Sequence, residues 1–117
     1  MTEEWRPVRL GVLALESNYE VSSLGRVRNH KTGRVLKSYF IVNRSDDLYE
    51  KVVLYHAGLK HRRFVHRLVA VAFIANPEYK PEVNHFDENT LNNSAANLEW
   101  ATRIEQEAHK RFMKATA

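Results

Sequence analysis

The stretch that decides the fold runs from Val83 to His109 and reads VNHFDENTLNNSAANLEWATRIEQEAH. Its first half crowds a histidine, carboxylates and many asparagines into a few residues. A buried amide or imidazole that lacks a hydrogen-bond partner costs free energy, so a folding core would not select these side chains. One or two asparagines make a turn. This many asparagines beside a histidine indicate a site built for chemistry.

The same stretch predicts a strand, a loop, a second strand and a helix. Residues 82–86 and 98–101 read as two paired strands, with the asparagine-rich loop between them. Thr102 and Glu105 have the spacing of a capping box, in which the threonine caps the helix start and the glutamate reaches back. The apolar stripe of this last helix should consist of Ile104, Ala108 and Phe112.

The order of these elements brings distant polar side chains together. Asn84 and His85 lie on the first strand, and Asn97 leads into the second. Gln106 and His109 are three residues apart, so they share one face of the helix. An ordinary exposed helix face explains these last two residues about as well as a functional role does. We interpret Asn92 and Asn93 as turn residues.

The first half of the chain predicts a small antiparallel sheet of about four strands. Residues 24–28 and 34–39 read as a hairpin around a turn, while 48–55 and 59–64 are rich in the residue types that strands prefer. Residues 65–74 change to a helical period and carry an apolar stripe that should pack on the sheet. We therefore expect an α+β fold.

The composition of the 117 residues limits the possible classes of protein. This length allows one domain with a modest core. The absence of cysteine excludes disulfides and thiolate zinc sites, so we expect no structural zinc. No apolar run approaches the ~20 residues of a membrane span, and the first residues do not resemble a signal peptide. We expect a soluble cytoplasmic protein that makes no contact with a membrane.

Positive charge is moderate in total but is gathered in three clusters. The formal net charge is +4, which favours nucleic acid as a partner without requiring it. Basic residues gather in 26–37, 60–67 and 103–114. Charge runs are usually solvated faces, so the clusters alone do not establish a binding surface.

At three places the sequence resembles the HNH endonucleases of phage and intron homing type. The first is Val83 to Asp87, continued by Leu91–Asn93 and Asn97–Trp100, and the second is the helix that begins at Val65. The segments at Glu4–Val8, Tyr19–Ser22 and Leu24–Arg28 resemble a short module often found before such nuclease domains. The resemblance implies a ββα-metal nuclease that cuts DNA phosphodiesters. It places a β-rich module that contacts DNA in residues 1–64 and the nuclease domain in 65–117, packed as one compact unit.

The resemblance also implies a role for each polar residue of the motif. His85 would be the general base that activates water, and Asn84 a metal ligand through its side-chain oxygen. Asn97 would be the middle residue of the motif, holding the loop and His85 in place. Gln106 stands where the family usually has an asparagine or histidine ligand, and His109 could substitute for it. The cofactor would be one divalent cation, Mg²⁺ or Mn²⁺.

One position of the loop departs from the family pattern. Glu88 stands where the family commonly shows glycine. Glycine adopts a positive φ without strain, whereas other residues seldom adopt it. We therefore expect either a different loop conformation or local backbone strain at this residue.

The chemistry of phosphodiester cleavage is consistent with these roles. An imidazole with a pKa near ~6.5 can take a proton from water near neutral pH. Double-stranded DNA would be the partner, and its phosphates would be contacted by basic side chains, which bring salt-sensitive affinity and little sequence reading. The candidates for these contacts are Arg26, Arg28, Lys60, Arg62, Arg63 and Arg67.

Two other classes of function stay open at the level of sequence. One is a catalytically weak DNA-binding protein that keeps the nuclease scaffold, and Gln106 is the residue that argues for it. The other is a structural or interaction protein with a polar loop, which would show no salt-dependent affinity for DNA. For a nuclease, one active site handles one phosphodiester, so a monomer would nick DNA and a homodimer could cut both strands. The resemblance also favours a phage-encoded protein that acts in the host cytoplasm.

Overall fold

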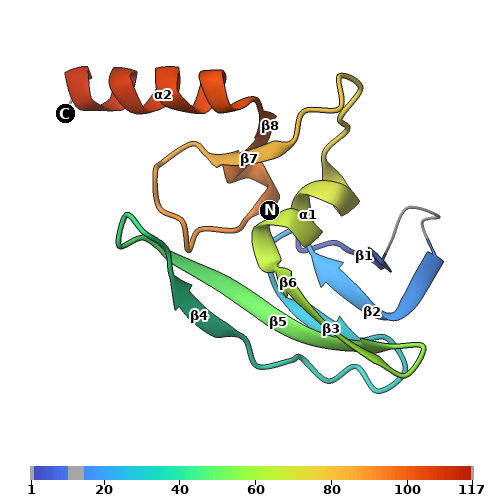
Figure 1. Ribbon diagram of the computed structural model, residues 1–117. Coiled ribbons are helices and arrows are strands. Elements are labelled where there is room, and N and C mark those ends of the chain that lie inside the picture. The colour runs from blue at the N-terminus through green and yellow to red at the C-terminus, as the bar shows by residue number, and fades with distance from the viewer. Residues whose placement is uncertain (1, 11–14, 117) are drawn as a thin grey trace.

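The computed structural model describes residues 2–10 and 15–116, and it has an α+β fold (Figure 1). The described part forms three small antiparallel sheets, in the strand orders β1-β2-β3, β4-β5-β6 and β7-β8. Within it, no helix combines the length and apolarity needed to cross a membrane. The elements are β1 (Trp5–Leu10), β2 (Leu15–Ser22), β3 (Val27–Asn29), β4 (Tyr39–Val42), β5 (Leu48–His56), β6 (Leu59–Phe64), α1 (Val65–Phe73), β7 (Glu82–His85), η1 (Ala95–Asn97), β8 (Leu98–Ala101) and α2 (Arg103–Thr116).

Helix α1 holds the three sheets together. It contacts strands of every sheet, and Figure 1 shows it between them. Its buried residues Val65, Leu68 and Val69 fall on the predicted apolar stripe, which confirms the helix expected over 65–74. They share one core with side chains from each sheet: Val8, Leu10, Tyr19, Val21, Val27, Val52, Leu54, Val83 and Leu98.

Side chains from both ends of the chain satisfy the last carbonyls of α1. These carbonyls have no partner inside the helix, so other groups must bond them. The guanidinium of Arg6 on β1 donates to the carbonyl of Ala72 over 2.9 Å. The indole nitrogen of Trp100 on β8 donates to the carbonyl of Ile74 over 3.0 Å. The end of α1 is therefore fixed between β1 and β8.

Four of the predicted strands are present in the structure, and one is not. Strands β5, β6, β7 and β8 confirm four of the predicted strands within a residue or two. The strand predicted over 34–39 is wrong, because residues 34–38 make only an isolated bridge between Arg28 and Val35. Strand β3 pairs with β2 instead. The hydroxyl of Ser17 on β2 donates to the carbonyl of Val8 on β1 over 2.9 Å.

The last helix starts as predicted but packs differently. The backbone N–H of Thr102 donates to the Glu105 carboxylate over 2.9 Å, and the N–H of Glu105 donates to the Thr102 hydroxyl over 3.1 Å. This reciprocal pair is the capping box. The apolar stripe does not face the core, because Ile104 is 79% and Phe112 63% exposed and no residue of α2 is buried. Helix α2 projects along the edge of the molecule in Figure 1.

The loop after β2 packs directly on the asparagine-rich loop. The backbone N–H of Ala95 donates to the carbonyl of Ser23 over 2.8 Å. Gly25 has φ +90°, and a Cβ atom at this position would lie 3.0 Å from the Cβ of Asn93. The close approach therefore requires a residue without a side chain.

The ring of His66 is buried at the junction of the sheets. It lies 5.3 Å from the Phe64 ring, 5.5 Å from the Tyr49 ring and 5.2 Å from the His85 ring, measured between centroids. Its Nδ1 atom is buried without a hydrogen-bond partner. Burial, followed by electrostatic interaction with His85 and Arg67, lowers the pKa of His66 to about 3. The ring is therefore neutral in the folded protein at neutral pH.

Gly25→Ala should lower the free energy of unfolding by about 1–3 kcal/mol, because it adds both a steric contact with Asn93 and a strained backbone. Gly33→Ala is the matched control: this glycine has φ +73° but no atom within 4 Å of the added Cβ. Urea titrations of both variants measure the difference. Equal losses of stability would show that the contact with Asn93 contributes nothing.

His66→Phe should make the free energy of unfolding less dependent on pH. In the wild type, the unfolded chain binds a proton at this residue below about pH 6.5 and the folded chain does not, so stability falls as the pH drops toward 3. The loss amounts to about 1.4 kcal/mol per pH unit for one proton. Urea titrations between pH 7 and pH 4 measure this slope in both proteins. Parallel slopes would contradict a depressed pKa at His66.

Candidate functional site

Three of the predicted site residues meet at one small cleft. Asn84 and His85 reach it from β7, and Gln106 reaches it from α2. The cleft has a volume of about 70 Å³. Its lining consists of Asp47, Tyr49, Val83, Asn84, His85, Glu88, Thr90, Gln106 and Lys110.

His85 is held at the floor of this cleft by a buried amide. Only 5% of the residue is exposed, and its Nε2 atom lies 2.9 Å from Oδ1 of Asn93. No hydrogen bond within the described residues engages Nδ1, and His85 contributes to the lining of the cleft. One nitrogen of the ring is therefore fixed and the other is available.

Asn93 holds His85 in place, although its sequence context predicted only a turn residue. Asn93 is 3% exposed and therefore part of the interior. The role expected of Asn97 divides between two asparagines. Asn97 fixes the loop and Asn93 fixes the ring. The local sequence does not indicate which asparagine bonds the His85 ring, because several asparagines follow His85 within a short stretch of the loop.

Asn97 organises the loop through its own amide. Its Nδ2 atom donates to Oδ1 of Asp87 and to the carbonyl of Asn92, each over 2.9 Å. The backbone N–H of Asp87 donates back to Oδ1 of Asn97 over 3.2 Å. Hydrogen bonds from the side chain of Asn92, the backbone of Asn89 and the side chain of Asn97 lower the pKa of Asp87. A charged Asp87 therefore anchors the loop at neutral pH.

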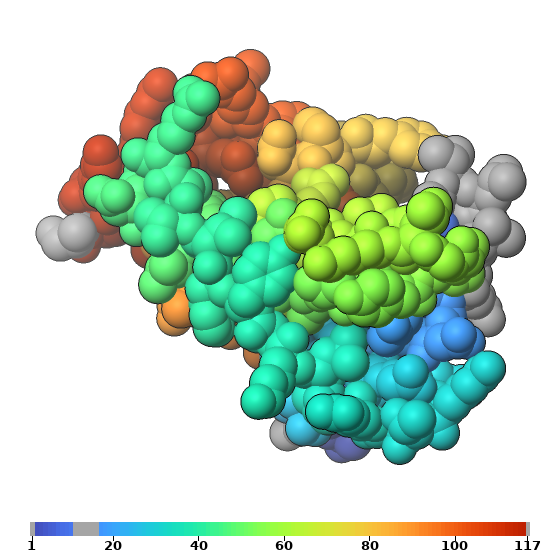
Figure 2. Space-filling model, turned by 60° about the horizontal axis from the view of Figure 1, so that its bottom comes forward, coloured from blue at the N-terminus to red at the C-terminus, as the bar shows by residue number. Residues whose placement is uncertain are grey.

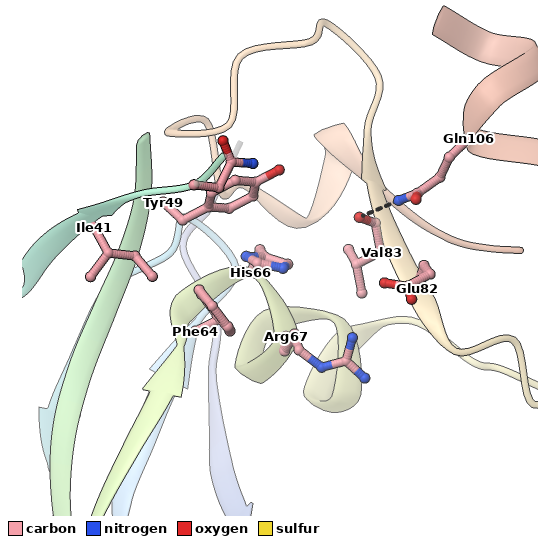
Figure 3. Close-up of a pocket in the computed structure, with 9 residues that line it drawn as sticks. Ile41, Tyr49, Phe64, His66, Arg67, Glu82, Val83 and Gln106 are labelled. Carbon is pink, nitrogen blue, oxygen red and sulfur yellow. Dashed lines mark hydrogen bonds between the residues drawn. The ribbon is translucent and has the colours of Figure 1, made fainter. Parts of the chain in front are cut away.

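The amides of Asn84 and Gln106 have their nitrogen atoms occupied by protein acceptors. Nδ2 of Asn84 donates to the carboxylate of Glu99 over 3.2 Å. Nε2 of Gln106 donates to the carbonyl of Val83 over 3.2 Å, as Figure 3 shows. A carboxylate and a carbonyl only accept, so these contacts fix which end of each amide is the oxygen. Among the described residues, neither side-chain oxygen has a hydrogen-bond partner.

The donor set of the cleft fits a hard divalent cation. Amide oxygens and carboxylates are the ligands that Mg²⁺ takes, and the lining adds the carboxylates of Asp47 and Glu88. No group of three histidine, cysteine or acidic residues is arranged to hold a metal in the part of the chain that the structure describes. A cation here would therefore depend on amides and on oxygens of a substrate.

His109 lies outside the cleft. Its Nε2 atom is 3.0 Å from the carbonyl of Phe86 and 3.7 Å from Oε1 of Glu88. A ring nitrogen that faces a carbonyl must carry a proton to bond it, so Nε2 of His109 cannot ligate a metal while it makes this contact. Of these two residues of α2, Gln106 lines the cleft and His109 does not.

Glu88 adopts a strained backbone, which is one of the two outcomes expected at this position. Its φ is +62°, in the left-handed region that glycine occupies without cost. Its N–H donates to the carbonyl of His85 over 3.1 Å, which closes a turn directly after the histidine. The chain thus turns sharply at this point without glycine.

The predicted DNA-contact residues fall into two groups. Arg26 pairs with Glu3 at 2.5 Å, Arg28 pairs with Glu20 at 3.0 Å, and Arg67 donates to the carbonyl of Pro81 over 3.0 Å. The Arg26 guanidinium lowers the pKa of Glu3 to about 2. These three arginines are engaged within the protein.

The second group lies on the hairpin of β5 and β6. Lys60 and Arg62 are exposed, and neither makes an ion pair within the described residues. Arg63 donates to the carbonyl of Arg62 over 3.1 Å and contacts His61. This hairpin lies across the face of the molecule shown in Figure 2. Two cations on it are therefore free to meet an anionic partner.

A second cleft of about 250 Å³ adjoins the first. The two share Tyr49, Val83 and Gln106. In Figure 3 Gln106 reaches from α2 to Val83, while His66 and Arg67 lie on the side of α1. The small cleft thus opens beside a wider one that carries a cationic side chain.

Comparisons with known proteins match two parts of the chain to family models. Residues 3–40 match the NUMOD4 motif. Residues 63–108 match the HNH endonuclease domain. The second range contains Asn84, His85, Asn93 and Gln106.

Relatives of this chain include viral endonucleases. An uncharacterized HNH endonuclease of Acanthamoeba polyphaga mimivirus, L245, is 40% identical over 100 residues, which cover 86% of this chain and 27% of that protein. The DNA endonuclease I-HmuI of Bacillus phage SP01 is 34% identical over 100 residues, which cover 86% of this chain and 53% of that protein. The chain therefore spans about half, or less, of the length of these relatives.

A solved structure of I-HmuI has the same fold. The structure, described as DNA binding and cleavage by the HNH homing endonuclease I-HmuI, aligns with a TM-score of 0.73 and 30% identity. The alignment covers 97% of this chain and 60% of that one. The chain therefore has the arrangement of its HNH endonuclease relatives, with a NUMOD4 motif in residues 3–40 ahead of an HNH endonuclease domain in residues 63–108.

Proposed function

We propose that this chain hydrolyses DNA phosphodiester bonds with the help of one divalent cation. The observation that carries the proposal is the meeting of Asn84, His85 and Gln106 at one cleft, with the nitrogens of both amides turned toward protein acceptors. Its relationship to I-HmuI, named as a DNA endonuclease, gives the substrate class. The relatives from a phage and a giant virus favour a phage or viral origin and a homing role.

In this proposal His85 is the general base. Its Nε2 atom is held by Asn93, so the proton of an attacking water would pass to Nδ1. The buried bond to Asn93 would keep the ring in one orientation while the water attacks the scissile phosphate. Tyr49 and His66 pack against the ring and limit the water around it.

Asn84 and Gln106 would hold the cation through their side-chain oxygens. When bound, a divalent cation would neutralise charge at the scissile phosphate and stabilise the leaving 3′ oxygen. Glu99 and the Val83 carbonyl keep both amides in the required orientation. Contacts of this kind around metal ligands typically change metal affinity or activity about 10–100-fold.

DNA would lie over the hairpin of β5 and β6 and reach the cleft beside α1. Lys60 and Arg62 are the exposed cations on this path, and Arg67 lines the wider cleft. Phosphate contacts of this type give affinity that falls with salt and carry little sequence information. Lys60, Arg62 and Arg67 would therefore contribute affinity for DNA and not recognition of a target sequence.

His85→Ala should lower the rate of plasmid nicking by at least about 10²-fold, because the general base is lost. Supercoiled plasmid with Mg²⁺ or Mn²⁺ should be converted to open circles by the wild type, and EDTA should stop the reaction. DNA binding at low salt, followed by gel shift, should be unchanged in the variant. A wild type that binds DNA without cutting it under any of these conditions would instead indicate a DNA-binding protein that keeps the scaffold alone.

Gln106→Ala should raise the Mg²⁺ concentration needed for half-maximal nicking by about ten-fold or more, because one proposed ligand is removed. His109→Ala is the matched control on the same helix, and its Mg²⁺ requirement should stay near the wild-type value. Nicking rates measured over a Mg²⁺ titration distinguish the two variants. The reverse result would move the ligand role from Gln106 to His109.

A further inference from the structure

Asn93 bonds His85 on one side and a carboxylate from β5 on the other. Its Nδ2 atom donates to Oε1 of Glu50 over 3.1 Å, and its Oδ1 atom lies 2.9 Å from Nε2 of His85. Asn93 and His85 are both buried. The three side chains therefore form a continuous hydrogen-bonded series from the N-terminal half of the chain to the proposed base.

The carboxylate determines the direction of every bond in this series. A carboxylate only accepts hydrogen bonds, so the donor end of the Asn93 amide must face Glu50. The acceptor end then faces His85, which can bond it only with a proton on Nε2. In the neutral ring the other nitrogen, Nδ1, is therefore the one with a free lone pair. Glu50 thereby selects the tautomer of the ring.

Glu50 is itself held in place. The hydroxyl of Ser38 donates to Oε2 of Glu50 over 2.5 Å. Glu50 pairs with Phe40 across β4 and lies two residues before the buried Val52, on the same face of β5. A carboxylate at an inward-facing register of a strand is costly unless it is bonded, and here both of its oxygens are bonded.

We propose that Glu50 is a positioning residue that fixes the tautomer of His85 through Asn93. The effect of Glu50 on the rate of DNA cleavage rests on the proposed function, whereas its effect on the tautomer of His85 does not. Glu50 lies outside residues 63–108, so a residue beyond the matched nuclease domain completes its site. Position 50 therefore requires a side chain that accepts hydrogen bonds and does not donate them.

Glu50→Gln tests this requirement with a side chain of nearly the same shape. A glutamine can donate as well as accept, so the Asn93 amide can then present either end to His85. Long-range ¹H–¹⁵N spectra of the deprotonated His85 ring, assigned with His85→Ala, report which nitrogen carries the proton. The wild type should show one tautomer with the proton on Nε2. In Glu50→Gln the ¹⁵N shifts of the two ring nitrogens should move toward one another.

The double variant Glu50→Gln with Asn93→Asp should restore the wild-type tautomer. Here the carboxylate is at position 93, where it accepts from Nε2 of His85 and from the glutamine amide at the same time. Rescue by exchanging the two groups would not follow from a general loss of packing. Glu78→Gln, at an exposed position in the loop before β7, is the control and should leave the ring spectrum unchanged.

Nicking rates give the second readout. Glu50→Gln should lower kcat about 10–100-fold with KM for plasmid near the wild-type value, because the residue acts through the base and not on DNA. A single Nε2–H tautomer in Glu50→Gln, or an Nδ1–H ring in the wild type, would overturn the proposal. If the wild type does not cut DNA, the proposed function fails and the ring spectra still decide the role of Glu50.

Discussion

The buried amide of Asn93 is the constraint on which the rest of the site depends. It meets His85 and Glu50 through hydrogen bonds and lies against Gly25 with no space for a side chain between them. An amide has one donor end and one acceptor end, so it can satisfy both neighbours in only one orientation. Both loops and β5 must therefore be correctly placed before the histidine can be. The packing of these segments and the orientation of His85 therefore depend on the same amide group.

Elements that depend on local pattern could be predicted from the sequence. Helix α1, the β7–β8 hairpin and the capping box of α2 all follow from spacing within a few residues. The meeting of Asn84, His85 and Gln106 followed from the order of these elements. The positive φ of Glu88 was one of two alternatives for a residue that stands where glycine is usual.

Features that depend on distant pairing could not be predicted in the same way. The bond between Glu50 and Asn93 joins residues 43 positions apart, and no local pattern specifies which of several asparagines β5 will meet. The division of the role expected of Asn97 between Asn93 and Asn97 has the same origin. One signal was present in the sequence: Glu50 occupies the same face of its strand as Val52 and Leu54, where an apolar residue is expected. The apolar stripe of α2 was misjudged because period alone does not say whether a partner covers it.

The dependence of the histidine on both halves of the chain has a consequence for recombination between genes. Segments of one chain that match separate family models, such as the NUMOD4 motif and the HNH endonuclease domain here, are natural candidates for exchange. Here any crossover between the two matched segments, in residues 41–62, would separate the glycine at position 25 from Asn93, and a crossover after residue 50 would separate the carboxylate at position 50 as well. A functional chimera would have to inherit these residues together, or a second carboxylate and a second glycine at equivalent positions. In this protein the smallest unit that evolution or an engineer could transplant intact is larger than the HNH domain.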